Sequence, residues 1–173
     1  MEFETERLRL RDFTIEDSPF ILRLLNEPSF IQFIADKGVR TLDQARDYLL
    51  NGPIKSYETH GHGLYAVELQ ESSELIGMCG LIKREQFADI DLGYAFLPEF
   101  WSKGFALEAA SAVLAFGERS LGLTRTIALV SPDNMASIKL LQKLGFAYSR
   151  EIKMDESDPG TALYEREGHL QPE

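Results

Sequence analysis

Cysteine and histidine are scarce in this chain, and long apolar runs are missing. Its 173 residues include one cysteine, Cys79, and three histidines. One cysteine cannot close an internal disulfide and makes a thiolate metal site improbable, so we expect no bound metal. Its place in the apolar run LIGMCGLI favours a buried small side chain, and the lack of disulfides indicates a reducing cytoplasm. No apolar run approaches the roughly 20 residues that cross a bilayer, so no membrane partner is expected.

Basic residues are also fewer than acidic ones. The chain has 18 Lys and Arg against 28 Asp and Glu, a formal net charge of −10. This balance argues against tight binding to a nucleic-acid backbone, which needs clustered basic residues. It tolerates a cationic partner such as an amine, although solubility alone would explain it. Neither G-x-G-x-x-G nor G-x-x-x-x-G-K-[ST] occurs, which disfavours a nucleotide-binding α/β protein.

The start, MEFETERLRL, is acidic and then alternating, which is not typical of a signal peptide. No repeat or linker-like stretch divides the chain, so we expect one domain over residues 1–173. Hydrophobic periodicity and turn residues predict these strands: 6–13, 64–69, 74–82, 89–97, 124–130, 146–154 and 161–167. They predict helices over 14–26, from 41 with an interruption near 52–53, over 104–121 and from 133 to about 144. His60 and His62 flank a glycine and are read as solvated turn residues. The order of elements predicts a mixed α/β sheet with helices on both faces.

The stretch FWSKGFALEAA, residues 100–110, carries the first chemical signal. Gly104 has no Cβ and lets the backbone run close to another group. The helix that follows presents free N–H groups at its start. Together these features favour an anion site, with phosphate as the first candidate. The alternative is a capped helix whose glycine serves packing.

Three segments then carry a family resemblance: TERLRLRDF, DLGYAFLPEFWSKGFALEA and SPDNMASIKLLQKLGF. Their order and spacing resemble the opening strand, the strand–loop–helix and the second signature helix of GNAT-type acyl-CoA N-acyltransferases. The chain is similar to the branch that includes the ribosomal-protein N-terminal alanine and serine acetyltransferases, over about residues 5–168. The resemblance implies a central, mostly antiparallel sheet with a splayed parallel strand pair and helices on both faces.

The resemblance also implies a cofactor site for acetyl-CoA as co-substrate. Main-chain N–H groups of the loop and first helical turn would bind the pyrophosphate: Ser102, Lys103, Gly104, Phe105, Ala106 and Leu107. Main chain at Ala95, Phe96 and Leu97 would pair with the pantetheine arm, which Asn134 would also contact. Trp101 stands where the wider family has Gln or Arg, a departure seen in this branch. Lys139 and Lys143 would reach the 3′-phosphate or simply form a solvated face.

The catalytic residues are less clearly marked. Many relatives carry a tyrosine acid seven residues after the asparagine, and here that position is Leu141. Ser137 is the substitute candidate, because its hydroxyl can hydrogen-bond a leaving thiolate; the alternative is a passive helix residue. Asp91 is the first candidate for the base, ahead of Glu85 and the pair at 155–156. The amine could instead lose its proton to water.

The predicted function is direct transfer of an acetyl group from acetyl-CoA to a primary amine. The acceptor would be a protein N-terminus or a small amine such as a polyamine or an aminoglycoside. The alternative is a catalytically degenerate GNAT-fold module that binds CoA or a partner. Either a monomer or a homodimer is compatible with the sequence.

Overall fold

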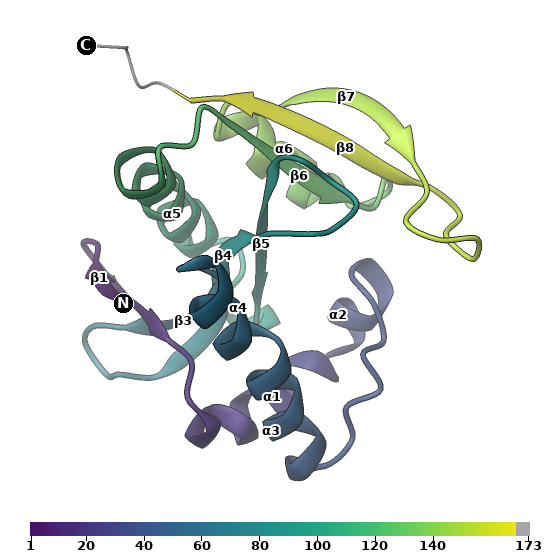
Figure 1. The fold of residues 1–173 in the computed structure, drawn as a ribbon. Helices are drawn as coiled ribbons and strands as arrows, with labels where there is room; N and C mark the ends of the chain where they lie inside the picture. Colours follow the sequence, from purple (N-terminus) through teal and green to yellow (C-terminus); the bar gives the residue numbers. More distant parts are fainter. Residues whose placement is uncertain (169–173) are drawn as a thin grey trace.

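The computed structural model describes residues 1–168 and is built around one eight-stranded sheet (Figure 1). The strand order is β1-β2-β3-β4-β5-β6-β8-β7. The strands are β1 (Glu2–Glu4), β2 (Leu8–Asp12), β3 (Leu64–Leu69), β4 (Leu75–Ile82), β5 (Ile90–Phe96), β6 (Arg125–Val130), β7 (Ala147–Ile152) and β8 (Thr161–Glu167). The α-helices are α1 (Ser18–Leu25), α2 (Pro28–Phe33), α3 (Leu42–Asn51), α4 (Pro53–His60), α5 (Phe105–Leu121) and α6 (Met135–Lys143). The mixed α/β fold expected from the sequence is confirmed.

The helix starts follow local rules, with one correction. Thr14 caps a short 3₁₀ turn that leads into α1, and Thr41 caps α3 by accepting a hydrogen bond from Gln44 N–H. The sequence predicts no helix between residues 26 and 41, but Pro28 begins α2 there. Proline suits that position because the first turn of a helix does not use its N–H. The short strand β1 was not predicted.

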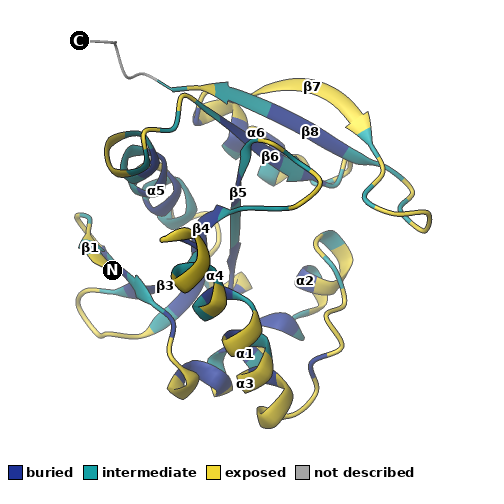
Figure 2. Cartoon of the chain, in the orientation of Figure 1, coloured by how far each residue is buried: buried dark blue, intermediate teal, exposed yellow. Residues whose placement is uncertain are grey.

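The two faces of the sheet bury two separate sets of apolar side chains. One set joins strand residues such as Leu10 and Leu92 to α5 and α6, and the other joins Ala66 and Met78 to α1, α2 and α3. Figure 1 shows α1 to α4 gathered in the lower part of the view and α5 and α6 in the upper part. In Figure 2 the middle of the sheet is buried while the outer helix faces are exposed. Helices therefore cover both faces, as predicted.

The sheet is interrupted between β5 and β6. These two strands are parallel, and they pair only at Ile90 with Thr126 and at Asp91 with Ile127. Beyond that point β5 continues to pair with β4, and β6 continues to pair with β8 as far as Val130. All other neighbouring strands are antiparallel. The predicted splayed parallel pair is thus confirmed. Within residues 1–168, no helix combines the length and apolar character needed to cross a membrane.

Candidate active site

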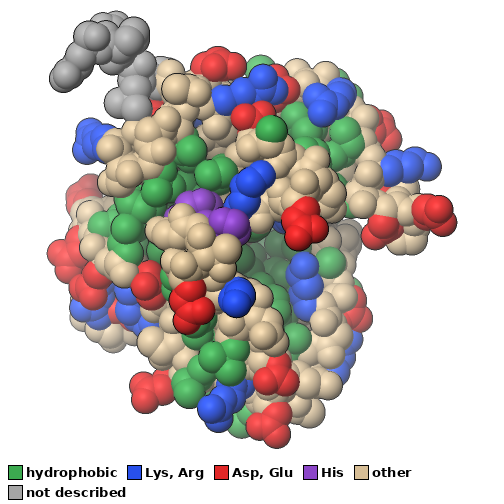
Figure 3. Space-filling model, in the orientation of Figure 1, with side chains coloured by type: hydrophobic (Ala, Val, Ile, Leu, Met, Phe, Trp, Pro, Cys, Tyr) green, Lys and Arg blue, Asp and Glu red, His purple; other side chains and the backbone are tan. Residues whose placement is uncertain are grey.

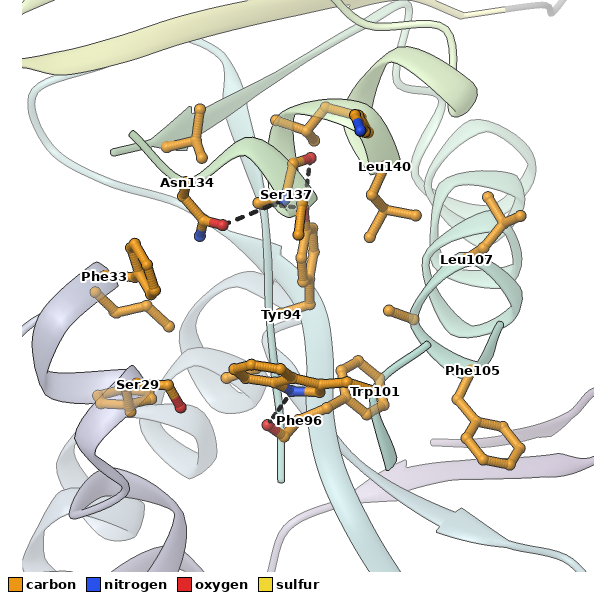
Figure 4. A pocket seen from close by; sticks show the side chains of 18 of the residues that line it. Ser29, Phe33, Tyr94, Phe96, Trp101, Phe105, Leu107, Asn134, Ser137 and Leu140 are labelled. Carbon is orange, nitrogen blue, oxygen red and sulfur yellow. Dashed lines mark hydrogen bonds between the residues drawn. The ribbon is translucent and has the colours of Figure 1, made fainter. Parts of the chain in front are cut away.

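The gap between β5 and β6 opens into a cleft of about 520 Å³ (Figure 4). The start of α5 forms one end, α6 forms a side wall, and α2 forms the opposite end. Nine of the predicted site residues line it: Ala95, Phe96, Ser102, Gly104, Phe105, Ala106, Leu107, Asn134 and Ser137. The structure therefore brings together most of the cofactor residues expected from the sequence. Three predicted residues, Asp91, Leu97 and Lys103, do not line the cleft.

The loop before α5 has a left-handed backbone at two positions. Gly104 is the N-cap with φ +81°, and no side chain caps the helix. Ser102 also adopts a left-handed backbone, with φ +61°, which is uncommon for a serine. Within residues 1–168, no hydrogen bond is donated by the main-chain N–H groups of residues 102–107. These donors lie at a helix N-terminus, where a negative charge is stabilised.

The start of the chain holds this loop in place. Arg7 donates from Nη1 to the carbonyl of Lys103 at 3.0 Å and from Nε to Glu108 Oε2 at 2.7 Å. Its guanidinium also lies over the Phe105 ring, 4.4 Å from the centroid. Glu108 accepts further hydrogen bonds from Thr5 Oγ1 and from the main-chain N–H of Arg7. Burial raises the pKa of Glu108, but these hydrogen bonds outweigh it and leave that pKa below its usual value. A charged glutamate thus fixes the loop from the first turn of α5.

Asn134, Ser137 and Tyr94 bring polar groups to the cleft. Asn134 caps α6, and its Oδ1 accepts a hydrogen bond from Ser137 N–H at 3.3 Å. Ser137 Oγ lies 2.5 Å from the hydroxyl oxygen of Tyr94, which reaches it from β5 (Figure 4). Burial is the main reason that the pKa of Tyr94 rises to about 12, and the contact with Ser137 opposes that rise. Leu141, at the position of the family's tyrosine, is buried in the core.

The edge of β5 is only partly available for a ligand. Leu97 donates its N–H to Ile76 O on β4 at 2.9 Å, so that group faces away from the gap. The carbonyl of Phe96 accepts a hydrogen bond from Trp101 Nε1 at 2.9 Å (Figure 4). A carbonyl oxygen has two lone pairs, so one acceptor position remains on Phe96.

Comparison with known proteins places this geometry in a family. The sequence-family model described as "Acetyltransferase (GNAT) domain" matches residues 7–147. The chain belongs to the GNAT acetyltransferase family. It is 34% identical over 146 residues to the uncharacterized N-acetyltransferase YoaA of Bacillus subtilis, covering 83% of this chain and 81% of the relative. It is also 30% identical over 168 residues to the uncharacterized protein YkkB of B. subtilis, covering 95% of each.

A solved acetyltransferase structure shares the fold closely. RimL, a ribosomal L7/L12 alpha-N-protein acetyltransferase in complex with coenzyme A, superposes with a TM-score of 0.86. The match covers 99% of this chain and 100% of that one, at 17% sequence identity. At this identity the likeness establishes the fold alone.

The candidate bases of this GNAT protein lie away from the cleft. Asp91 is 2% exposed, and its Oδ2 accepts a hydrogen bond from Arg84 Nε at 2.6 Å. Burial, opposed by Arg84, raises the pKa of Asp91 to about 6. Glu85 and the pair at 155–156 are exposed and do not line the cleft. Asp91 is therefore positioned to neutralise Arg84, and its role as a base stays a prediction.

The reading of His62 as a solvated turn residue is wrong. Its side chain is buried, and Nδ1 lies 2.8 Å from the carbonyl oxygen of Leu81. Burial lowers the pKa of His62, which favours the neutral ring. His60 is exposed, as expected. Within residues 1–168, no group of three or more His, Cys, Asp or Glu side chains could hold a metal ion.

Sequence reasoning missed three parts of this GNAT site: the Arg7–Glu108 pair, the hydroxyl of Tyr94 and the wall formed by α2. The first joins residues 101 positions apart, and the second joins residues 43 positions apart. No local spacing rule connects such distant positions. The alternation of β5 could have placed Tyr94 on the α6 face, but it could not name its partner.

Proposed function

We propose that this protein transfers an acetyl group from acetyl-CoA directly to a primary amine. The observation that carries the proposal is the parting of β5 and β6 after Asp91 and Ile127, which opens a cleft between a helix N-terminus and Ser137. Membership of the GNAT family supports acetyl transfer, and RimL, a neighbour in fold, binds coenzyme A. We further propose that residues 1–173 act as one domain.

The proposed cofactor orientation follows from charge. The free main-chain N–H groups of residues 102–107 suit the diphosphate. Two lysines in the cleft wall, Lys139 and Lys143, lie on α6 and are exposed, which suits phosphate rather than an apolar arm. The pantetheine arm would then run past Ala95 and Phe96 toward Asn134. This arrangement leaves the α2 end of the cleft for the acceptor.

In this proposal Ser137 stabilises the leaving group. Acetyl-CoA supplies the thioester, and the amine nitrogen attacks its carbonyl carbon. The C–S bond then breaks, and its electron pair stays on sulfur. The hydroxyl of Ser137 would hydrogen-bond the thiolate, which takes a proton from water. No acyl-enzyme is needed, because Cys79 is buried and the cleft presents serine hydroxyls without an adjacent imidazole among the residues described.

Few of the described side chains that line the cleft could accept a proton from the amine. Among the described residues that line the cleft, Glu27 is the one carboxylate, and it lies 3.7 Å from Arg23 Nε. Most of the lining is apolar, and an apolar site favours a neutral amine over an ammonium ion. We therefore propose that the amine loses its proton to water on entering, with Asp91 kept as the alternative base.

The acceptor is proposed to be a protein N-terminus or a small amine. Acidic and basic side chains are interspersed over the face shown in Figure 3, and hydrophobic side chains show in the hollow between them. A net charge of −10 favours a cationic acceptor over nucleic acid. The cytoplasmic location and the choice between monomer and homodimer stay predictions.

Thiol release from acetyl-CoA tests the proposal. The acceptors are a peptide with a free α-amine, a matched Nα-blocked peptide with one lysine, and spermidine. If water takes the proton, kcat/KM should rise with pH toward the amine pKa, which is about 8 for an α-amine and about 10.4 for lysine. CoA binding without turnover of any amine would instead support the degenerate module. Absence of CoA binding would overturn the proposal.

A further inference from the structure

The hydroxyl of Tyr94 is the one polar side-chain group that contacts Ser137 Oγ among the hydrogen bonds described. Tyr94 lies three residues beyond Asp91, in the part of β5 that no longer pairs with β6. Its ring crosses the gap toward the first turn of α6, and both residues line the cleft (Figure 4). The 2.5 Å separation is short even for two hydroxyl groups.

Ser137 is held from two directions. Asn134 fixes its main chain through the cap of α6, and the Tyr94 hydroxyl contacts its side chain closely and its carbonyl oxygen at 3.5 Å. A hydroxyl has one hydrogen and two lone pairs, so the direction of the hydrogen bond decides what Ser137 can offer a ligand. If Tyr94 donates, the hydrogen of Ser137 stays free to point into the cleft. If Ser137 donates, its hydrogen is used up on Tyr94.

We propose that Tyr94 is the positioning residue for Ser137: its phenol donates to Ser137 Oγ and so turns the serine hydrogen toward the thioester sulfur. This inference rests on the proposed function. Donation to Oγ also polarises the serine hydroxyl and strengthens the hydrogen bond that it gives. The high pKa of Tyr94 is compatible with this role, because a neutral phenol keeps its proton throughout the working pH range.

The residue at position 141 supports the proposal, because many relatives carry a tyrosine acid there and this chain has Leu141 instead. That residue lines the cleft with 1% of its surface exposed, but it is a leucine, so α6 presents no phenol to the cleft from there. Tyr94 brings a phenol to the same wall from the strand. It acts through the serine and is not itself required to touch the sulfur.

Removal of the single oxygen atom tests the role. Tyr94→Phe should lower kcat about 10- to 100-fold and change KM for acetyl-CoA less than threefold. Ser137→Ala should cause a similar loss, and the double variant should lose little more, because the two residues act as a unit. The matched control is Tyr148→Phe on β7, whose side chain is 59% exposed; it should leave kcat unchanged. Additive losses in the double variant, or a change confined to KM, would overturn the proposal.

A second measurement needs no acceptor and no turnover. The thiol of bound CoA is titrated by its thiolate absorbance, with the spectrum of the free protein subtracted at each pH. A hydrogen bond from a correctly turned Ser137 stabilises the thiolate, so its pKa should be about one unit lower in the wild type than in Tyr94→Phe or Ser137→Ala. Equal values in wild type and Tyr94→Phe would refute the positioning role, even if acetyl transfer is established. Conversely, failure of every amine to react leaves this titration able to decide the role of Tyr94.

Discussion

A negative charge placed at Gly104 gives the sharpest test of the phosphate loop. Gly104→Asp and Gly104→Asn differ by one charge and almost nothing in size, and both residues tolerate the left-handed backbone that φ +81° requires. An added Cβ would meet Arg7 Nη2 at 3.3 Å, a tight contact that a shift of the guanidinium by a few tenths of an ångström would relieve. Both variants should therefore fold, each with about 1 kcal/mol less stability than the wild type.

The expected difference in CoA binding free energy between the two variants follows from the charges at the loop. Two unit charges 4 Å apart interact by about 1 kcal/mol in water and about 4 kcal/mol near a protein surface. Arg7 lies beside position 104 and would neutralise part of the new carboxylate. We therefore expect the aspartate to weaken CoA binding, relative to the asparagine, by an amount in the lower part of this range, about 1–2 kcal/mol. The aspartate variant should bind CoA about 5- to 30-fold more weakly than the asparagine variant.

Calorimetric titration with CoA at low and high salt measures this difference. Screening should shrink the gap between the two variants at high salt. Pantetheine, which has the same arm but no phosphate, should bind both variants equally. Equal CoA affinities at low salt in two folded variants would refute the assignment of the diphosphate to this loop.

Three further changes test other parts of the structure. Asp91→Asn removes a carboxyl whose pKa folding raises from 3.8 to about 6. In the wild type, the neutral form of this carboxyl stabilises the fold below pH 3.8, and this stabilisation is lost as the pH rises through 6. Relative to Asp91→Asn, wild type should thus lose up to about 3 kcal/mol of unfolding free energy between pH 4 and pH 7, measured in urea, and a constant difference would contradict this. Glu108→Gln should raise KM for acetyl-CoA several-fold with kcat unchanged, because Arg7 loses its charged partner; a loss confined to kcat would contradict the bracing role. Trp101→Phe should lower the unfolding free energy by about 1 kcal/mol, since Phe96 O loses its indole donor, whereas an unchanged urea midpoint would show that this hydrogen bond contributes nothing.

The sequence predicts the elements of this fold well where local rules decide. Thr41 and Asn134 cap helices as their side chains suggest, and the alternation of Leu8 and Leu10 marks a strand with one buried face. The helix α2 was missed because a proline such as Pro28 can end one helix or begin another, and only the packing of α2 decides.

The site is less predictable because its contacts join distant segments. Nine residues that the motifs predicted to bind a cofactor or act in catalysis line the cleft, and their roles stay predictions. Lys103 was expected at the phosphate site, yet it does not line the cleft, and its ammonium lies over the Phe100 ring, 5.7 Å from the centroid. His62 was read as solvated because a glycine on either side suggests an open turn; packing against Leu81 buries it instead. Such outcomes depend on tertiary neighbours that no local pattern specifies.

Two residue pairs join β5 to β6, so the sheet consists of two weakly connected parts, here called slabs. One slab carries β1 to β5, and the other carries β6, β8 and β7. Segments joined by few main-chain hydrogen bonds open locally at low free-energy cost, so the smaller slab should exchange its amide hydrogens as a unit. A ligand that spans the gap touches both slabs and couples their opening. If CoA binds across the gap as proposed, amide exchange along β6 should therefore slow when CoA is added, because the ligand would hold the two slabs together.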